Sequence, residues 1–335
     1  MARLLILGGT GFVGRHVTEA ALDAGHHVGL FNRGKTNPEA FAGRDVELLV
    51  GDRSTSDLGA LSKSGDWDAC VDVNAYVPRV VREACEALDG RAGHYTYIST
   101  VSVYVPTDKG PIDEDSPLRT LDDPTTENVD NETYGPLKVL CEEVAMQAFP
   151  GNCTVIRPGI VAGPYDSTDR FTYWVRRMAQ GGDVLAPNRP HQPMQVVHGR
   201  DQADFVVKAS VEKTHGQFNS VGPTEPLTFA GMLDACAAAA GTAGSVAVEW
   251  VDENFLQDES VYLPLWLPSE SGIDGLFEAS SERARAAGLV NRPIVDTVAD
   301  TLPWDRTRDQ AEAIAGMPRE REQELLAKWR EPTQG

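Results

Sequence analysis

The stretch "ETYGPLK", residues 132–138, sets Tyr134 and Lys138 four positions apart, a spacing that brings both side chains to one face of a helix. A phenol titrates near pH ~10, so forming a phenolate at neutral pH costs about 4 kcal/mol unless a cation stabilises it. Lys138 is such a cation. Pro136 suits the first turn of a helix, which predicts that the helix begins just before Tyr134. The pair is a candidate for proton transfer, with packing as the alternative interpretation.

Hydroxyl side chains precede this pair at the end of an expected strand. The stretch "YISTVSVY" contains Ser99, Thr100 and Ser102. Open parallel sheets bind ligands at the carboxyl ends of their strands, so these hydroxyls stand where such a sheet presents catalytic groups. Their position favours chemistry over packing for Tyr134.

A glycine-rich stretch, "GGTGFVG", lies between the first apolar run and the first helical pattern. Glycine permits a tight turn, a close approach of the backbone to a pyrophosphate and close packing of the helix on the strand, while the helix N-terminus favours the anion. The surrounding strand, turn and helix are the context that this motif requires. The stretch therefore predicts a nucleotide site with the candidate residues Gly8, Thr10, Gly11, Phe12, Val13 and Gly14.

The end of the second expected strand, "FNRGK", favours NADP over NAD. NAD enzymes usually place an acid there for the ribose 2′-hydroxyl, but this chain has Asn32. Arg33, with Lys35 close by, can pair with a 2′-phosphate, and solvated loop charges are the alternative. Asp52 ends the third strand, where a carboxylate can accept a hydrogen bond from the adenine amino group. Further candidate cofactor contacts follow the third and fourth strands, namely Arg53, Asn74 and Ala75.

Short apolar runs alternate with helical patterns through the first half of the chain. We expect strands at 3–8, 26–33, 46–52, 68–74, 94–100 and 153–159, and helices at 14–25, 79–89 and 134–148. This repeated order predicts an α/β fold, a Rossmann-like doubly wound parallel sheet with right-handed crossovers. A strand and a helix within 195–211 are expected to return to the sheet.

Beyond residue 165 the alternation loosens, which indicates a second region. Helical or strand patterns remain at 166–182, 229–241, 246–252 and 294–304, and the polar end, 305–335, is expected to add a surface helix. We expect a Rossmann domain of residues 1–165 plus about 195–222. A smaller α+β substrate-binding cap would comprise residues 166–194 plus 223–335.

Composition argues against several classes of function. The 335 residues carry a net charge of −20, and no cluster of Lys and Arg offsets it, which argues against nucleic acid as a partner. No run of about 18 apolar residues suggests a membrane span, and the start lacks a signal-peptide pattern, so we expect a soluble, cytoplasmic protein. Scattered cysteines and histidines predict neither disulfides nor a metal site. The expected partner is a small-molecule substrate, with a homodimer left open.

Together these stretches resemble an extended short-chain dehydrogenase/reductase, the class that includes NAD-dependent epimerases and dehydratases. The similarity runs from "GGTGFVG" through "YISTVSVY", "YGPLK" and "RPGIVAGP" to "VVHGRDQADFV". The overall pattern is closer to an atypical branch, some relatives of which have been linked to RNA in plastids. The resemblance implies hydride transfer with NADP or NAD. Tyr134 would move the proton, Lys138 would hold the nicotinamide ribose and tune Tyr134, and Thr100 would hydrogen-bond the reacting oxygen.

Two departures concern the diphosphate that the family's nucleotide-sugar members bind. Ile160 stands where those members usually have asparagine, and Met194 stands at the position of the arginine that grips the diphosphate. Arg189 and Arg200 are candidates to replace that arginine. Losing both contacts argues against a typical nucleotide-sugar epimerase.

Other candidate substrate contacts are expected in loops near the pocket mouth, with packing of the cap as the alternative; they are Tyr76, Asp169, Arg170, Tyr173 and Trp266. His198 is expected to be structural. Three functions stay open. The first is an oxidoreductase acting on a ketone or secondary alcohol of a small molecule, and the second is a sugar or nucleotide-sugar epimerase or dehydratase that retains its cofactor. The third is a non-catalytic cofactor- or RNA-binding scaffold, which the intact Thr100, Tyr134 and Lys138 and the charge of −20 disfavour.

Overall fold

A parallel sheet forms the centre of the larger part of the molecule. The structure, a computed structural model, describes residues 1–309 and 314–331. Its main sheet has seven strands in the order β11-β6-β5-β4-β1-β2-β3, and every neighbouring pair is parallel. The strands are β1 (Arg3–Leu7), β2 (His27–Asn32), β3 (Val46–Val50), β4 (Ala69–Asp72), β5 (Tyr95–Ile98), β6 (Cys153–Pro158) and β11 (Gly216–Ser220). The strand order reverses between β1 and β4, where such sheets bind ligands.

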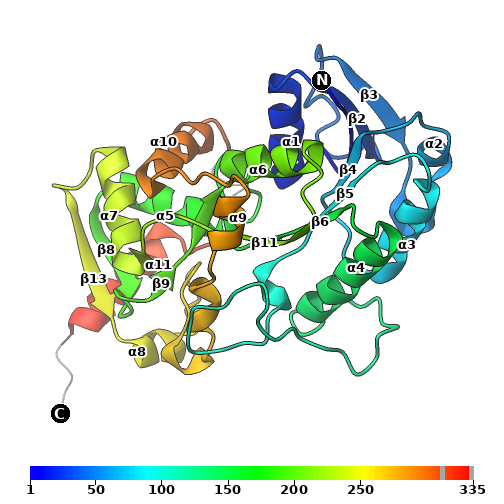
Figure 1. Ribbon diagram of the computed structural model, residues 1–335. Coiled ribbons are helices and arrows are strands. Elements are labelled where there is room, and N and C mark those ends of the chain that lie inside the picture. The colour runs from blue at the N-terminus through cyan, green and yellow to red at the C-terminus, as the bar shows by residue number, and fades with distance from the viewer. Residues whose placement is uncertain (310–313, 332–335) are drawn as a thin grey trace.

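Helices cover both faces of this sheet, as Figure 1 shows. Helices α1 (Phe12–Asp23) and α6 (Gly199–Val211) pack together on one face, and α3 (Pro78–Ala87) and α4 (Tyr134–Ala148) pack on the other. Strands β4, β5 and β6 are buried along their whole length, because a parallel sheet has no solvent face. Shorter elements between the strands are α2 (Gly59–Ser62), η1 (Arg53–Thr55) and η2 (Val101–Val103). The predicted doubly wound α/β fold is confirmed.

The strand that returns to the sheet differs from the expectation. Within 195–211 the strand β10 (Val196–His198) pairs with β7 (Ile160–Ala162) in a separate two-stranded sheet. The seventh strand of the main sheet is β11, which follows α6 and pairs with β6. Its sequence, "GQFNS", is mostly polar although Asn219 and Ser220 are buried, so it carries no apolar run that would have indicated a strand.

The second region has its own apolar core, built around Phe171, Trp174 and Phe229. Strand β13 pairs with β8 in parallel, and β12 pairs with β9 in antiparallel fashion. Figure 1 shows this cap beside the main sheet. Its elements are α5 (Arg170–Ala179), β8 (Gly182–Pro187), β9 (Pro193–Met194), β12 (Leu227–Thr228), α7 (Phe229–Ala240), β13 (Val246–Val251), α8 (Glu253–Asp258), η3 (Ser269–Ser271), η4 (Asp274–Phe277), α10 (Ile294–Asp305) and α11 (Arg319–Arg330).

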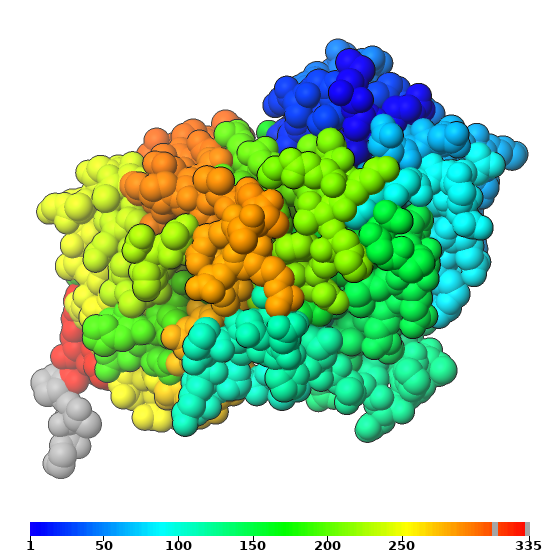
Figure 2. Space-filling model, in the orientation of Figure 1, coloured from blue at the N-terminus to red at the C-terminus, as the bar shows by residue number. Residues whose placement is uncertain are grey.

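Two segments after residue 223 pack differently from the expectation. Helix α11 was expected on the surface, but Leu325 and Leu326 are buried in the cap core, and Glu322 forms an ion pair with Arg177 at 2.7 Å. Helix α9 (Glu282–Ala286) and the residues after it pack against the core beneath α6, to which Ala284 belongs. In Figure 2 this segment, in orange, lies between the N-terminal half and the cap. Residues 282–289 therefore connect the cap to the main sheet.

Candidate active site

The glycine-rich turn between β1 and α1 is shaped to hold a phosphate. Gly8 has a φ of +92°, and a Cβ on Gly14 would lie 2.2 Å from the carbonyl oxygen of Gly8, so both positions require glycine. Gly11 is the N-cap of α1 with no capping side chain, and a Cβ there would meet no atom within 4 Å. Within the described part of the chain, no side chain therefore caps the first N–H groups of α1. These features fit the pyrophosphate of a dinucleotide.

A cavity of about 610 Å³ extends from this turn along the ends of β1, β2, β3 and β4. Twelve candidate residues from the sequence line it, namely Gly8, Thr10, Gly11, Phe12, Val13, Gly14, Asn32, Arg33, Asp52, Arg53, Asn74 and Tyr76. Four other residues expected to contact the cofactor are not part of the lining, namely Lys35, Ala75, Tyr134 and Lys138. The residues that the sequence did not indicate are Phe31, Thr36, Gly51, Ser54, Val73, Val77, Val80 and Ser167. The sequence could have indicated Ser54 as a neighbour of the candidate Asp52, since an Asp two residues before a Ser often forms a local turn.

Basic side chains gather at the end of the cavity near β2 and β3. Asn32 accepts a hydrogen bond from the backbone N–H of Gly34 at 2.7 Å, which shapes the turn that carries Arg33. No acidic group among the described residues forms an ion pair with Arg33. Asp52 accepts hydrogen bonds from the Ser54 hydroxyl and backbone N–H, and these bonds, with smaller effects of Arg33 and Lys35, lower the pKa of Asp52. The side chains of Arg33 and Lys35 thus both lie close to Asp52.

Arg53 connects the third strand to the glycine-rich turn. Its guanidinium donates to both carboxylate oxygens of Asp72 at 2.8 Å and to Asn74 Oδ1 at 2.5 Å. Asp72 is fully buried and also accepts from the Tyr95 hydroxyl at 2.7 Å. Asn74 Oδ1 lies 2.6 Å from the place where a Cβ on Gly8 would be. The Arg53–Asp72 pair therefore fixes the wall against which the turn packs, and its charge is neutralised there.

Tyr134 and Thr100 meet at the carboxyl edge of the sheet. Thr100 follows β5 and is the N-cap of η2, and Tyr134 is the first residue of α4. Burial raises the pKa of Tyr134, while a hydrogen bond with Thr100 and, more weakly, the charge of Arg170 lower it. The ring of Tyr76, which lines the cofactor cavity, lies 6.2 Å from the ring of Tyr134. The candidate proton donor is therefore next to the candidate cofactor site.

The other two hydroxyls after β5 have different partners. Ser99 donates to the buried carboxylate of Glu142, which also pairs with Arg157 at 2.7 Å, so Ser99 belongs to the interior. Ser102 contacts Thr100 through its backbone N–H and its hydroxyl, at 3.1 and 3.2 Å. Ser102 therefore orients Thr100 and leaves Thr100 as the hydroxyl beside Tyr134.

Lys138 is buried beneath the same site and is 2% exposed. Its ammonium donates to the carbonyl oxygens of Ala75 at 2.9 Å and Ile98 at 2.7 Å, and it lies 4.2 Å from the centre of the Tyr97 ring. Burial lowers the pKa of Lys138 to about 8. Lys138 thus joins the ends of β4 and β5 and keeps one of its three N–H donors.

The candidate substrate residues separate into two groups. Tyr76 lies beside Tyr134, and the charge of Arg170 is close enough to lower the pKa of Tyr134, whereas Asp169, Tyr173 and Trp266 are buried inside the cap. Asp169 pairs with Arg308 at 2.8 Å, the ring of Tyr173 packs against Trp174, and the Trp266 indole donates to Glu253 at 3.0 Å. The structure uses these three side chains for packing and ion pairs and does not bring them to the cofactor cavity.

The positions considered for a diphosphate are occupied by other interactions. Met194 is 1% exposed in the cap core, and Ile160 packs against that core. Arg189 forms an ion pair with Asp274 at 2.5 Å, and Arg200 pairs with Asp300 at 3.1 Å. His198 is structural: it is the N-cap of α6, and its Nδ1 accepts from the Arg200 backbone N–H at 2.9 Å.

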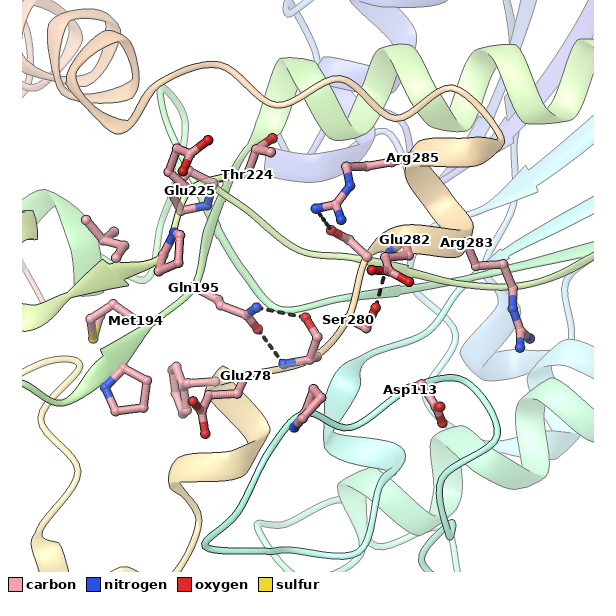
Figure 3. A pocket seen from close by; sticks show the side chains of 18 of the residues that line it. Asp113, Met194, Gln195, Thr224, Glu225, Glu278, Ser280, Glu282, Arg283 and Arg285 are labelled. Atoms are coloured by element: carbon pink, nitrogen blue, oxygen red, sulfur yellow. Dashed lines mark hydrogen bonds between the residues drawn. The ribbon is translucent and has the colours of Figure 1, made fainter.

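A second cavity of about 600 Å³ lies between the cap and the loop 111–114, and it shares no residue with the first. Figure 3 shows Gln195 within it. The Gln195 amide exchanges two hydrogen bonds with the backbone of Ala279, at 2.8 and 3.0 Å. Arg283 pairs with Asp115, and Arg285 donates to the Ser281 hydroxyl at 3.2 Å. The bonds of Gln195 and Arg283 tie the segment 279–283 to residue 195 and to the loop at 115, and Met194, a position named from the sequence, lines this cavity.

Among residues 1–309 and 314–331, no group of three or more His, Cys, Asp or Glu side chains is placed to hold a metal ion. Over the same residues, no helix combines the length and apolarity needed to cross a membrane.

Known proteins share this fold. UDP-N-acetylglucosamine 4-epimerase from Bacillus cereus superposes with a TM-score of 0.68 at 18% identity, covering 91% of this chain and 100% of that one. UDP-glucuronic acid 4-epimerase from Bacillus cereus in complex with NAD gives 0.65 at 16% identity, covering 91% and 98%. At these identities the likeness shows the fold alone.

Sequence comparison adds a curated relative and the family. The chain is 29% identical over 252 residues to the chloroplast stem-loop binding protein of 41 kDa b of Arabidopsis thaliana, an alignment that covers 71% of this chain. It spans only 63% of the length of that relative. The sequence profile of the NAD dependent epimerase/dehydratase family matches residues 4–222, which include the glycine-rich turn, Thr100, Tyr134 and Lys138. The chain therefore belongs to the NAD-dependent epimerase/dehydratase family.

Proposed function

We propose that this protein is an NADP-preferring oxidoreductase that transfers a hydride between the cofactor and a ketone or secondary alcohol of a small molecule. The observation that carries the proposal is the contact of Tyr134 with Thr100 beside the glycine-lined cavity. A packing tyrosine would need neither a hydroxyl partner nor a position at the carboxyl edge of the sheet. A tyrosine that donates a proton to a substrate oxygen needs the hydroxyl partner and that position.

Tyr134, Thr100 and Lys138 have separate roles in the proposed proton transfer. The cofactor, when bound, supplies or accepts the hydride. Because burial raises the pKa of Tyr134, its phenol is protonated at neutral pH and ready to donate to the oxygen of a ketone. Thr100, oriented by Ser102, is placed to hydrogen-bond the same oxygen. Lys138 fixes the backbone below and has one N–H donor for the nicotinamide ribose.

The preference for NADP rests on the end of β2. Arg33 lines the cavity without an ion-pair partner in the described part of the chain, and position 32 is an uncharged asparagine. A guanidinium recognises a phosphate with charge-assisted hydrogen bonds, whereas the ribose 2′-hydroxyl of NAD is usually held by a carboxylate.

Net redox chemistry is separated from epimerisation by one experiment. A collection of cellular metabolites is screened for thermal stabilisation of the NADP⁺-bound protein, and each hit and its oxidised or reduced partner are incubated with NADPH or NADP⁺. We expect the cofactor to be consumed in a 1:1 ratio with product. Conversion of a hit into its stereoisomer without net change in the cofactor would contradict the proposal and would show that the protein is an epimerase.

RNA is the alternative partner that the name of the A. thaliana relative raises. The net charge of −20 argues against it, since the phosphate backbone dominates the affinity of most proteins for RNA. A gel shift with stem-loop RNA at low salt tests this. A complex that weakens as salt is added would support the RNA-binding scaffold.

A further inference from the structure

We propose that the substrate is a small compound with a carboxylate or phosphate group close to its reacting carbon, and that Arg170 binds this group. The inference rests on the proposed function, because it places the anion beside Tyr134. It also narrows the class of substrate, since neutral ketones and nucleotide sugars would need other contacts.

Arg170 is an exposed cation near the edge of the cofactor cavity, without a partner charge in the described part of the chain. It begins α5, three residues after Ser167, which lines the cofactor cavity together with Tyr76. Tyr76 in turn contacts Tyr134. Arg170 is exposed, and no carboxylate in 1–309 or 314–331 lies within ion-pair distance of it. Within the described part of the chain, its side chain donates one hydrogen bond, from Nε to the Thr168 hydroxyl at 3.3 Å. An unpaired guanidinium beside a reaction site suits an anionic group.

The loop before Arg170 is held in place from several sides. The Arg15 guanidinium lies 3.7 Å from the centre of the Tyr165 ring, and His16 Nε2 lies 2.9 Å from the Pro164 carbonyl oxygen. Asp166, which is 1% exposed, accepts hydrogen bonds from the backbone N–H and the hydroxyl of Thr168 at 2.8 and 2.7 Å. Thr168 is thus fixed and directs Arg170. Such preorganisation reduces the entropy lost when a ligand binds.

Nearby acids do not neutralise Arg170. Asp166 lies close enough for the Arg170 charge to lower its pKa somewhat, but burial outweighs this effect and raises the pKa overall. The neighbouring Asp169 pairs with Arg308 on the other side of the loop. The positive charge of Arg170 is therefore not neutralised by these acids, and it lowers the pKa of Tyr134.

The same structure disfavours a nucleotide diphosphate as the anion. The two arginines considered for that role, Arg189 and Arg200, are held in ion pairs by Asp274 and Asp300. Met194 offers no charge. One guanidinium beside Tyr134 matches one compact anionic group.

Binding of malonate and malonamide to the NADP⁺-saturated protein tests the proposal. Malonate carries carboxylates and malonamide is its neutral analogue, so titration calorimetry compares charge at nearly constant shape. We expect malonate to bind about tenfold or more tightly than malonamide, and Arg170→Gln to remove that difference. Arg170→Lys should restore part of it. The control is Arg82→Gln, which removes an exposed arginine of α3 that has no ion pair among the described residues.

Each outcome bears on the proposal. Loss of malonate binding in Arg170→Gln but not in Arg82→Gln supports it. Equal affinity for malonate and malonamide, or malonate binding that survives Arg170→Gln, overturns it. Binding of UDP that is much tighter than that of malonate or inorganic phosphate would also overturn it, in favour of a diphosphate site. Because no turnover is measured, these results stand apart from the success or failure of the proposed hydride transfer.

Discussion

Tyr134 owes its chemical environment to residues from separate elements. Thr100 comes from the end of β5 and Arg170 from the start of α5, and both lower the pKa that burial raises. Pro136, which suits the first turn of a helix, was sufficient to predict that α4 begins close to Tyr134. The partners of Lys138 could not be predicted, because the carbonyl oxygens of Ala75 and Ile98 belong to the backbone and leave no trace in residue type.

Arg33→Ala should weaken the binding of NADPH by about tenfold to a hundredfold and leave that of NADH nearly unchanged, because only NADPH carries the 2′-phosphate. Titrating both cofactors by fluorescence measures the two affinities. Lys35→Ala is the matched control, since Lys35 carries the same charge nearby but does not line the cavity. If the wild-type protein binds NADH more tightly than NADPH, the assignment of Arg33 is wrong.

Lys138→Met should lower turnover, weaken cofactor binding and destabilise the fold together. The variant loses the bonds from its ammonium to Ala75 and Ile98, which join β4 to β5 below the site. The pKa of Lys138 lies at about 8 because of burial, so the amine loses its charge above that pH. Activity that depends on this charge should decline in the wild-type protein through about pH 8 and show no such step in the variant. Normal cofactor affinity in Lys138→Met would contradict the ribose contact, and normal stability would contradict the structural role of the bonds to Ala75 and Ile98.

Helices α1 and α6 pack against each other through a buried polar contact between His16 and His198, here called the joint. His16 of α1 and His198 at the start of α6 have ring centres 6.1 Å apart, and a Cβ on Gly199 would lie 2.4 Å from the His16 ring. Burial is the main cause that lowers the pKa of His16 to about 4 and of His198 to about 2. The charges of Arg200 and Arg292 act in the same direction. Both histidines are therefore neutral in the folded protein at neutral pH.

This joint predicts a loss of stability in acid. Between its ordinary value of 6.5 and about 4, the unfolded state binds a proton at His16 that the folded state does not, so stability falls as the pH falls. From about pH 7 to about pH 5, His16 should account for a loss of about 2 kcal/mol. Urea unfolding of wild type and His16→Gln at both pH values measures this. Glutamine can still donate to Pro164, so the variant should lose less stability than wild type on acidification.

Exposed His191 provides the comparison for this measurement. The variant His191→Gln should keep the pH dependence of the wild type, since this side chain is not part of the joint. If His16→Gln and wild type lose the same free energy of unfolding between the two pH values, burial of His16 does not control the acid response.

At the scale of the whole molecule, the sequence was informative where the chain repeats a simple pattern. Alternating apolar runs and helices predicted six of the seven strands, and the glycine-rich stretch together with the strand ends predicted twelve of the residues that line the cavity. The roles of the cap residues were harder to predict, because residues that bind a ligand and residues that form contacts inside the cap can have the same type. Asp169 and Trp266 have the chemistry of ligand contacts, yet they form an ion pair and a hydrogen bond inside the cap. Only the tertiary arrangement distinguishes these uses.

The polar C-terminal segment shows the same limit. Its charges suggested a surface helix, but Glu322 is 1% exposed and bonds to Arg177 and to the backbone N–H of Leu185. A buried carboxylate with charged and backbone partners is stable in the interior. Residue type alone does not reveal such partners when they lie more than a hundred positions away in the chain.

The turnover of Tyr134→Phe, measured with a substrate from the metabolite screen, tests the central claim most directly. The change removes the phenolic oxygen and keeps the ring, so turnover should fall by about 10² to 10⁴ while cofactor affinity and melting temperature stay close to wild type. Tyr97→Phe is the matched control, because the Tyr97 hydroxyl bonds to the Ala75 carbonyl oxygen inside the fold. It should lower stability rather than the chemical step. A Tyr134→Phe protein that keeps turnover within a few fold of wild type, with normal stability, would show that Tyr134 is a packing residue and would contradict the mechanism.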